Sequence, residues 1–293
     1  MAPRNRNQLK GSVRNGIPKT EQPQQKERSN NISEKKTLTN TDKFNIWKKI
    51  RENAYNEKKE YWNKYDTFIL QSMSEMNNYL SRYPAYVRLD WLWIKAMLWT
   101  EGDADGHKNE WEHRPLRIGV PGDKGGPAVI AKSEAVGLII PPGSAWQGIT
   151  SSNMVSDPHM NIRAAIIYLM NRLSKSDIVS VDDPKDKTDY TVKISSVEHH
   201  GTLDAIAKDE ERIGTTMDIL KRENPGLDPR KIHSGEEIRY RKGSMKRVIT
   251  GWLFPVTAQI IAEKYNGGGD SMYAEKLSYV HSLFSSTTGN KNK

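Results

Sequence analysis

The sequence contains no cysteine, which excludes a disulfide framework, a cysteine nucleophile and thiolate metal sites. It has no apolar run of about 18 residues or more, so no segment is predicted to span a membrane as a helix. The first residues lack the apolar stretch, about 7–15 residues long, that is typical of a secretory signal peptide. Hydrophobic residues make up only 35% of the chain, too few for one continuous core. The length of 293 residues is instead typical of roughly two domains.

Positive charge is concentrated at the start of the chain. Residues 1–40 carry nine Lys or Arg residues against three Glu, and so supply +6 of the net charge of +9. They include no aromatic residue and few aliphatic ones, so they cannot bury enough apolar surface to offset the entropy lost on ordering. We therefore predict a disordered basic tail. It is either a solubilising leader or a segment that binds acidic lipid, a loading partner or nucleic acid, and the lack of interleaved aromatic residues argues against nucleic acid.

After the tail, apolar residues recur at helical spacing. Phe44, Trp47 and Ile50 begin a stripe that continues to residue 80, on one face of one or two helices. The charged residues of this run, Arg51 among them, are expected on the solvated face. Pro84 is expected to end the run, because the residue before a proline avoids helical backbone angles.

A glutamate follows the most hydrophobic helix, which we predict over residues 85–100. Apolar residues step by four, three and four from Val87 to Leu98, and Glu101 lies three residues further along the same face. Gly102 is expected to cap the helix in a left-handed conformation. Beside tryptophans, the carboxyl group would be poorly solvated, which raises its pKa and suits a general acid. The alternative is a glutamate that reaches the surface where the helix ends.

The segment after this helix is polar and rich in glycine. Asp103, Asp105 and Glu110 suggest a calcium loop, but only two aspartates precede Gly106 where the helix–loop–helix pattern of calcium-binding proteins has three. We therefore expect no metal ion and no cofactor.

Two further segments carry a resemblance to a known family. Residues 137–142 read GLIIPP and residues 157–169 read DPHMNIRAAIIYL. Asp157 can cap the helix that follows, and Pro158 suits its first position. With Glu101, these segments resemble the lytic transglycosylases, in the soluble-lytic-transglycosylase-like branch of the lysozyme superfamily. That family has a glutamate at a helix end, a Gly-Leu-Met-Gln stretch and an Asp-Pro-x-x-Asn-Ile helix start.

A fourth family element lies near the end of the chain. Residues 262–270 read AEKYNGGGD and are similar to the family motif Ala-x-x-Tyr-Asn-x-Gly, and residues 273–283 resemble its closing helix. The resemblance implies that Tyr265 and Asn266 lie near the catalytic glutamate and the bound sugar.

The stretch around residue 137 departs from the family pattern. Gly137 and Leu138 match it, and the resemblance implies that they contact substrate. Ile140 stands where the family has a sugar-binding glutamine, and Glu134 adds a carboxylate nearby. The resemblance therefore implies altered substrate contacts here, or a weakened enzyme.

Between the two halves of this motif set lies a different pattern. Alternation at Tyr190 and Val192 predicts a strand, and Ile238 with Tyr240 predicts a second. Residues 188–242 resemble a LysM module, a two-helix, two-strand domain that binds N-acetylglucosamine-containing glycans. In this copy His200 replaces the usual acidic loop residue. The resemblance implies that the glycan contacts come from Gly201, Thr202, Leu203, Asn224 and Pro225.

The predicted fold is therefore mainly α. Residues 1–40 form the basic tail, and residues 42–180 with 246–285 form a discontinuous lysozyme-like helical domain. A small α+β module with a βααβ order, residues 188–242, is inserted into it. The stretches 177–189 and 241–244 are the expected junctions, since insertion is tolerated where chain ends meet at a surface.

The resemblance implies an enzyme that cleaves peptidoglycan. In the family, the glutamate protonates the oxygen between N-acetylmuramic acid and N-acetylglucosamine, then acts as a base on the muramic 6-hydroxyl and leaves a 1,6-anhydro product. We assign that role to Glu101. Two alternatives stay open: a muramidase in which Asp103, Asp105 or Glu110 activates water, and a non-catalytic wall-binding protein.

The substrate class also implies a place of action. Peptidoglycan lies outside the cytoplasm, so we expect activity in the periplasm or cell wall. Delivery would bypass the general secretory route, as for an injected antibacterial effector or a phage-type bacteriolytic enzyme, unless a leader precedes this sequence. The expected partners are peptidoglycan strands, a component of a secretion machine and a neutralising immunity protein.

Overall fold

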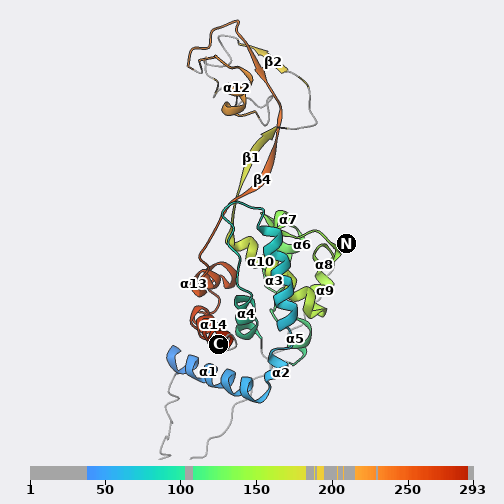
Figure 1. The fold of residues 1–293 in the computed structure, drawn as a ribbon, viewed down its shortest axis with the longest axis vertical. Coiled ribbons are helices and arrows are strands. Elements are labelled where there is room, and N and C mark those ends of the chain that lie inside the picture. Colours follow the sequence, from blue (N-terminus) through green and yellow to red (C-terminus); the bar gives the residue numbers. More distant parts are fainter. Residues whose placement is uncertain are drawn as a thin grey trace, which may run out of the picture. The chain divides into compact units, whose positions relative to one another are not determined.

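The computed structural model describes residues 38–102, 108–182, 188, 190–194, 203, 207, 215–228 and 230–289. The predicted tail lies almost wholly outside these ranges. Within them the chain is mainly α-helical, as predicted, with two antiparallel sheets of two strands each (Figure 1). The elements are α1 (Asn40–Glu57), α2 (Lys59–Trp62), α3 (Asp66–Leu80), α4 (Leu92–Glu101), α5 (Lys108–His113), α6 (Gly125–Ile130), α7 (Val136–Ile139), α8 (Ser144–Gln147), α9 (Ser151–Ser156), α10 (Pro158–Leu173), β1 (Ser174–Asp182), β2 (Tyr190–Lys193), α12 (Met217–Glu223), β3 (Glu237–Tyr240), β4 (Gly243–Trp252), α13 (Ala258–Ile261), the π-helical turn η2 (Ala262–Asn266) and α14 (Tyr273–Gly289).

The predicted start of α10 is confirmed. The Asp157 side chain accepts hydrogen bonds from the backbone N–H groups of His159, at 2.8 Å, and Met160, at 3.4 Å, and Pro158 occupies the first turn. These bonds satisfy N–H groups that have no partner inside the helix. Ile162 and Leu169 on its inward face are fully buried, so α10 lies in the main core.

The hydrophobic helix begins later than predicted. Its first residue is Leu92, whereas the prediction placed residues 85–91 in the helix as well. Asn77 on α3 takes both backbone groups of Leu89: its Oδ1 accepts from the N–H and its Nδ2 donates to the carbonyl, each at 2.9 Å. Ala85 has a positive φ of 58°, and Val87 is 56% exposed. The side-chain contact to Leu89 therefore replaces the helical bonds that the spacing suggested.

Glu101 ends α4, as predicted, but the predicted cap is wrong. Gly102 has φ −71° and ψ 144°, an extended conformation and not a left-handed one. A Cβ atom at this position would lie 2.6 Å from the Leu98 carbonyl oxygen and 2.8 Å from the Trp111 ring. Glycine is therefore required here for a close approach of α5 to the end of α4.

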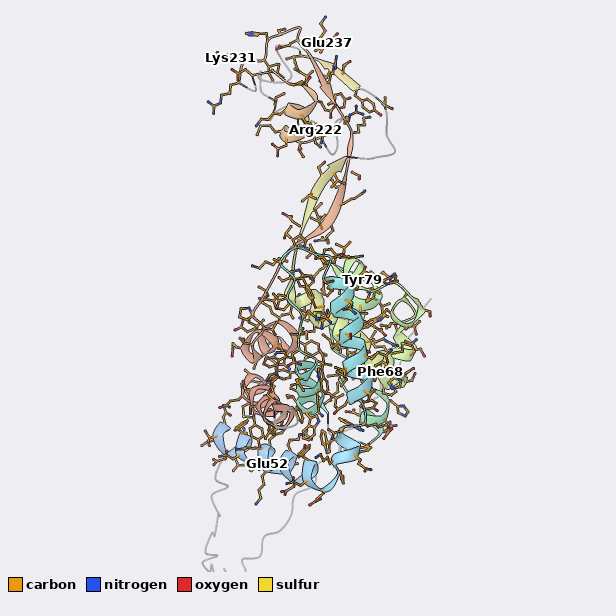
Figure 2. All side chains as sticks on the ribbon, viewed as in Figure 1. Glu52, Phe68, Tyr79, Arg222, Lys231 and Glu237 are labelled. Atoms are coloured by element: carbon orange, nitrogen blue, oxygen red, sulfur yellow. The ribbon has the colours of Figure 1, made fainter. Side chains whose placement is uncertain are left out.

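The N-terminal helical run forms three helices, where one or two were predicted. Trp62 of α2 packs on Trp99 of α4 with ring centroids 4.3 Å apart and on Trp111 of α5 at 4.9 Å. Ile50 of α1 is 49% exposed, against the prediction that it lies on the buried face. Figure 2 shows Phe68 and Tyr79 on α3 among the side chains of the helical part.

A ribbon of two paired strands connects the inserted segment to the helical part. β1 pairs with β4 from Ser174↔Trp252 to Asp182↔Gly243, so strands run through both predicted junctions. Beyond the ribbon, β2 pairs with β3, which confirms the two predicted strands. A separate small core holds this part together, and it consists of Ile194, Leu203, Leu220, Ile232 and Ile238.

Because the inserted segment joins the helical part through this paired ribbon, we predict that the helical part folds without the insert. Joining Val179 to Lys246 through Asn-Gly keeps a paired hairpin, because these two residues are already cross-strand partners. All eight tryptophans lie outside residues 188–242, so their fluorescence reports on the helical part. We expect the unfolding midpoint of the shortened chain to stay within about 4 °C of the full chain, equivalent to about 1 kcal/mol.

A deeper deletion serves as the control. Removing residues 175–251 also removes Ile249, which is 7% exposed and belongs to the main core. Losing a buried isoleucine is expected to cost about 2–5 kcal/mol, so this variant unfolds at a clearly lower temperature. Loss of cooperative unfolding in the shallow deletion would contradict the prediction.

Candidate active site

Glu101 lies at the end of a buried helix and faces a cleft. Ile94, Met97 and Leu98 bury α4 in the main core, and α4 packs along α14. Burial raises the pKa of the Glu101 carboxyl, while Tyr273 and Arg117 lower it in part. The negative charges of Asp270 and Asp123 raise it further. The C-terminal end of a helix also disfavours a negative charge. The group is thus held toward its protonated form, the first of the two alternatives that the sequence left open.

Tyr273 is the residue most closely tied to Glu101. It begins α14, is 2% exposed, and its hydroxyl makes no hydrogen bond of ordinary geometry within the described part of the chain. Burial and then the negative charge of Glu101 raise the pKa of this tyrosine. It therefore stays neutral and can donate a hydrogen bond to the ionised glutamate, which explains why it lowers the pKa of that carboxyl.

The cleft around Glu101 has a volume of about 550 Å³. Four segments distant in sequence supply its walls: α1, the end of α4, the loop before α6, and residues 266–276, which run from the end of η2 into α14. Its lining residues are Trp47, Ile50, Arg51, Thr100, Glu101, Arg117, Asn266, Gly269, Asp270, Tyr273 and Lys276.

Helix α1 forms one wall through a buried arginine. Arg51 is 6% exposed, against the prediction of a solvated position, and its guanidinium donates to the Gly102 carbonyl at 2.5 Å. The same guanidinium lies 5.7 Å from the centre of the Trp47 ring and 5.2 Å from that of Trp62. The two aromatic rings and the carbonyl dipole offset the hydration that the buried Arg51 guanidinium loses. The same contacts hold α1 beside Glu101.

Asp270 and Lys276 form an ion pair in the lining of the cleft. The Lys276 ammonium lies 2.8 Å from Asp270 Oδ2, and it also lies 5.5 Å from the centre of the Trp47 ring. Asp270 Oδ1 accepts from the Met272 N–H at 2.9 Å. Asp270 is thus a second carboxylate in the same cleft, already held by a cation and a backbone donor.

Asp123 organises the loop that borders the cleft. Its carboxylate accepts three backbone N–H bonds, from Gly119 and Gly126 at 2.7 Å each and from Gly125 at 2.9 Å. Its charge raises the pKa of Glu101 from outside the cleft lining. The carboxylate therefore shapes the loop and adds a smaller negative contribution at Glu101 than Asp270 does.

Two of the predicted substrate contacts lie at the cleft or beside it. Asn266 lines the cleft, and its Oδ1 accepts from the Asp270 N–H at 2.9 Å. Tyr265 precedes it in the π-helical turn, packs on Tyr168 with centroids 5.5 Å apart, and has its pKa raised by burial and then by the charge of Glu101. Gly267, with φ 65°, ends the turn. π-Helical turns are frequent at functional sites.

The predicted contacts in residues 137–140 lie elsewhere in the fold. Ile140 is 5% exposed and belongs to the main core. The Leu138 carbonyl accepts from the Tyr83 hydroxyl at 2.9 Å, and Gly137 lies on the short helix α7. Glu134 bonds to Asn171 Nδ2 at 2.9 Å. None of these residues lines the cleft, and their contact with substrate stays a prediction.

The alternative carboxylates lie only partly within the described ranges. Asp103 and Asp105 fall outside them. Glu110 is paired with Arg114 at 3.1 Å and with Arg117 at 3.6 Å, the second of which lines the cleft. Glu110 therefore holds Arg117 in place and does not itself line the cleft.

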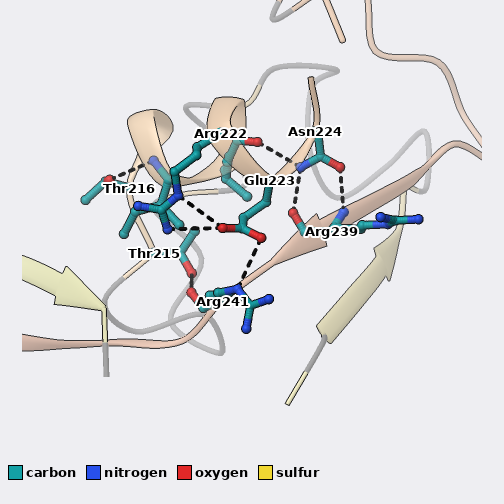
Figure 3. Close-up of polar contacts among 9 residues, drawn as sticks. Thr215, Thr216, Arg222, Glu223, Asn224, Arg239 and Arg241 are labelled. Atoms are coloured by element: carbon teal, nitrogen blue, oxygen red, sulfur yellow. Dashed lines mark hydrogen bonds and ion pairs between the residues drawn. The ribbon is translucent and has the colours of Figure 1, made fainter. Parts of the chain in front are cut away.

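In the inserted module, the predicted glycan contacts are only partly described. Gly201 and Thr202 lie outside the described residues, and Leu203 is fully buried in the small core. The side chain of Asn224 bonds the Leu220 and Arg239 backbones at 2.6–2.8 Å, as Figure 3 shows. Pro225 follows in the turn after α12. Asn224 thus joins α12 to β3, and glycan contact by this set stays a prediction.

Sequence analysis missed most of the charged groups around Glu101. Arg51 follows Trp47 by four residues, and that spacing on the apolar face was a usable signal. Asp270 and Tyr273 lie in the segment that carries the family resemblance, without having been assigned a role. Arg117 gave no signal in the sequence.

Comparison with known proteins identifies no relative of this chain. No protein-family model matches the chain, and neither a curated protein nor a solved structure matches it. Among the described residues there is no group of three or more metal-binding side chains, and none of the described helices is long and apolar enough to cross a membrane.

Proposed function

We propose that this chain is a lytic transglycosylase with a lysozyme-like helical domain, and that it cleaves the bond between N-acetylmuramic acid and N-acetylglucosamine in peptidoglycan. One observation carries the proposal: a desolvated carboxyl, Glu101, ends a buried helix and opens onto a cleft of about 550 Å³. Asn266, from the motif that resembles the family, lines the same cleft. A protonated acid beside a space large enough for a sugar is the minimum requirement for this reaction.

The proposed mechanism uses one carboxyl twice. Protonated Glu101 donates its proton to the glycosidic oxygen as the bond to the muramic C1 breaks. The resulting carboxylate accepts the proton of the muramic 6-hydroxyl, whose oxygen bonds to C1 and closes the 1,6-anhydro ring. Tyr273 and Arg117 favour the ionised form between the two steps, because both lower the pKa of Glu101. The acid is thereby regenerated without a second carboxylate.

Hydrolysis is the second candidate, and Asp270 favours it. This carboxylate lines the same cleft as Glu101, and a base there could activate water, as in inverting glycosidases. Its Oδ2 atom lies 2.8 Å from the Lys276 ammonium. A muramidase would then leave a reducing end in place of the anhydro ring.

Mass spectrometry of the soluble products separates these functions. Purified peptidoglycan digested by the wild-type chain is expected to release anhydromuropeptides. Products heavier by one water would show hydrolysis and direct attention to Asp270. Binding to peptidoglycan without any product would overturn the proposed enzyme and favour a wall-binding protein.

We propose that the inserted module is a LysM domain that holds the glycan. The two strands and the helix α12 match the order expected for it. Glu223 accepts from Arg241 at 3.1 Å, and Thr215 donates to the Arg241 carbonyl at 2.7 Å, contacts that brace α12 on the end of β3 (Figure 3). The enzyme would act on the cell wall, with the basic tail as its loading segment.

The charges around Glu101 predict opposite shifts in the pH dependence of cleavage. Arg117→Gln removes a cation that lowers the pKa of Glu101, so the loss of activity at alkaline pH moves to higher pH. Asp270→Asn removes an anion that raises the pKa of Glu101, so the loss of activity at alkaline pH moves to lower pH. The asparagine keeps an oxygen for the Met272 N–H. Initial rates between pH 4 and 10 measure both shifts, and a shift of the same sign in both variants would contradict the assignment of Glu101 as the acid.

A further inference from the structure

Arg163 of α10 is a cation without a polar partner. Its guanidinium carbon lies 4.8 Å from the centre of the Phe68 ring of α3 and 5.4 Å from that of the Trp146 ring of α8. Its Nε is buried, and the guanidinium makes no hydrogen bond or ion pair within the part of the chain that the structure describes. Buried donors are usually paired, because an unmade hydrogen bond of a charged group is costly. The two aromatic rings thus fix the position of Arg163 and leave its donors unused.

His159 lies one helical turn before Arg163 and contacts the same phenylalanine. Its ring stacks on that of Phe68, which Figure 2 labels on α3, with centroids 4.1 Å apart and an interplanar angle of 28°. Residues four apart lie on one face of a helix, so α10 presents both side chains to this ring. His159 is exposed, and neither of its ring nitrogens has a hydrogen-bond partner in the described ranges. Phe68 therefore gathers two side chains whose donors are unused.

Glu75 of α3 brings a carboxylate to this cluster, but both of its oxygens are engaged. Its Oε2 accepts from Trp146 Nε1 at 2.8 Å, and its Oε1 accepts from Gln71 Nε2 at 3.0 Å. Glu75 therefore holds the Trp146 ring in place and does not pair with Arg163. A carboxylate from outside the chain would match the planar fork of the guanidinium and supply the missing acceptors.

The exposed face of α3 continues from this cluster and carries no charge. Its residues recur at steps of three and four, which places them on one side of the helix. They are Thr67, Leu70, Gln71, Ser74 and Asn78. Leu70 is 50% exposed, and Gln71 connects the face to the cluster through its bond to Glu75. Charged residues make up 28% of the chain, whereas the cores of protein interfaces are depleted of charge and enriched in aromatic residues and arginine.

We propose that this face of α3, together with Phe68, Trp146, His159 and Arg163, is a docking surface for a partner protein, and that Arg163 binds an Asp or Glu side chain of that partner. An apolar side chain of the same segment would cover Leu70. Arg163 is the one permanent cation in this set, which is too little positive charge for nucleic acid or an anionic membrane. None of these residues lines the Glu101 cleft, so the docking surface is separate from it.

Selection from a library of phage-displayed random peptides tests this on the full-length chain. Peptides that bind the wild type are counter-selected against Arg163→Gln, which removes those that bind at the Glu101 cleft or at the inserted module. The surviving peptides are expected to contain an Asp or Glu close to an apolar residue. Isothermal titration calorimetry with these peptides should show at least about tenfold weaker binding to Arg163→Gln, as for the loss of a charge-assisted hydrogen bond.

A second variant and a matched control localise the effect. Leu70→Ser alters an exposed side chain, so it leaves the core intact even if Arg163→Gln fails to fold. It is expected to weaken the same peptides at least about threefold, because their apolar residue loses its contact. Arg247→Gln on the β1–β4 ribbon changes the net charge as Arg163→Gln does, at an exposed position outside the docking surface, and should leave the affinity unchanged.

Four results would overturn the proposal. Counter-selection could leave no peptide, or leave only peptides without an acidic residue. Binding of a single-stranded oligonucleotide or of phosphatidylglycerol vesicles that depends on Arg163 would assign the surface to nucleic acid or to a membrane. Self-association of the wild type that Arg163→Gln abolishes, measured by sedimentation velocity, would assign it to a second copy of this chain.

This inference does not rest on the proposed function. Arg163→Gln and Leu70→Ser leave every residue of the Glu101 cleft in place, so both variants are expected to release anhydromuropeptides at the wild-type rate. Conversely, a wild-type chain that releases no product would contradict the proposed enzyme and leave the peptide-binding results as they are.

Discussion

Glu101→Gln is expected to lower the rate of glycan cleavage by about 10²–10⁴-fold, the usual contribution of a positioned general acid and base. Glutamine has nearly the same shape as protonated glutamate but cannot give up a proton. Asn266, Tyr273 and the cleft walls stay in place, so the variant should still bind the glycan. Release of anhydromuropeptides, measured by mass spectrometry against the wild type, gives the ratio of rates.

The same substitution is expected to stabilise the fold at alkaline pH. Burial raises the pKa of Glu101 in the folded protein above its ordinary value of 4.5. Stability linked to this group is therefore complete below about pH 4.5 and is lost as the pH rises through the folded-state pKa. Glutamine never ionises, so the variant avoids that loss. The melting temperature should rise by about 2–4 °C for each kcal/mol recovered.

Thermal unfolding at pH 4 and pH 8 measures this effect. The difference in melting temperature between variant and wild type should be near zero at pH 4 and positive at pH 8. Glu57→Gln is the matched control, because it makes the same chemical change at an exposed position and should show no such difference. A Glu101→Gln variant that is equally active, or less stable at pH 8, would contradict the assignment of a desolvated catalytic acid.

Asn161→Ala is expected to cost about 3–5 kcal/mol of folding free energy. Asn161 is fully buried on α10. Its Oδ1 accepts from the Leu116 N–H at 2.9 Å, and its Nδ2 donates to the carbonyls of Ile118 and Met154 at 3.0 and 2.8 Å. Alanine leaves three buried backbone groups without partners, and each such group costs about 1–3 kcal/mol. The loop so released contains Arg117, so the cleft is expected to lose a wall as well.

Urea unfolding followed by tryptophan fluorescence measures this loss in the helical part. Asn153→Ala is the matched control: its side chain bonds the Thr150 N–H at 2.8 Å and the Gly148 carbonyl at 2.9 Å, but at the exposed surface. Water can replace those bonds, so the control should lose less than about 1 kcal/mol. Equal losses in both variants would show that the buried asparagine does not hold the loop.

Helix α10 shows where sequence analysis was sufficient and where it failed. Asp157 and Pro158 mark the start of α10 correctly, because a cap depends on residues within one turn of each other. Asn161 lies one turn further on in the motif that carries the family resemblance. Its contacts reach back 45 residues to the loop at Leu116, and no spacing rule in the sequence reveals them.

The prediction of where α4 begins was wrong for the same reason. The apolar spacing over residues 85–91 suits a helix, but Asn77 binds the backbone of Leu89 and prevents it. The β1–β4 ribbon was also missed, because β1 alternates poorly and its partner strand begins 61 residues after it ends. Local periodicity carries no information on which distant side chain or strand competes for the backbone.

The sequence by itself determined that Glu101 ends a hydrophobic helix, that the chain is mainly α, and that a small two-stranded module interrupts it. These features depend on periodicity, caps and turn residues, which act over a few neighbours. Only the tertiary structure brought Arg51, Arg117 and Tyr273 to the same carboxyl, from positions 50 residues before it to 172 residues after it. A pKa depends on every charge and every buried surface within a few ångströms, so chain folding alone sets the chemistry of that glutamate.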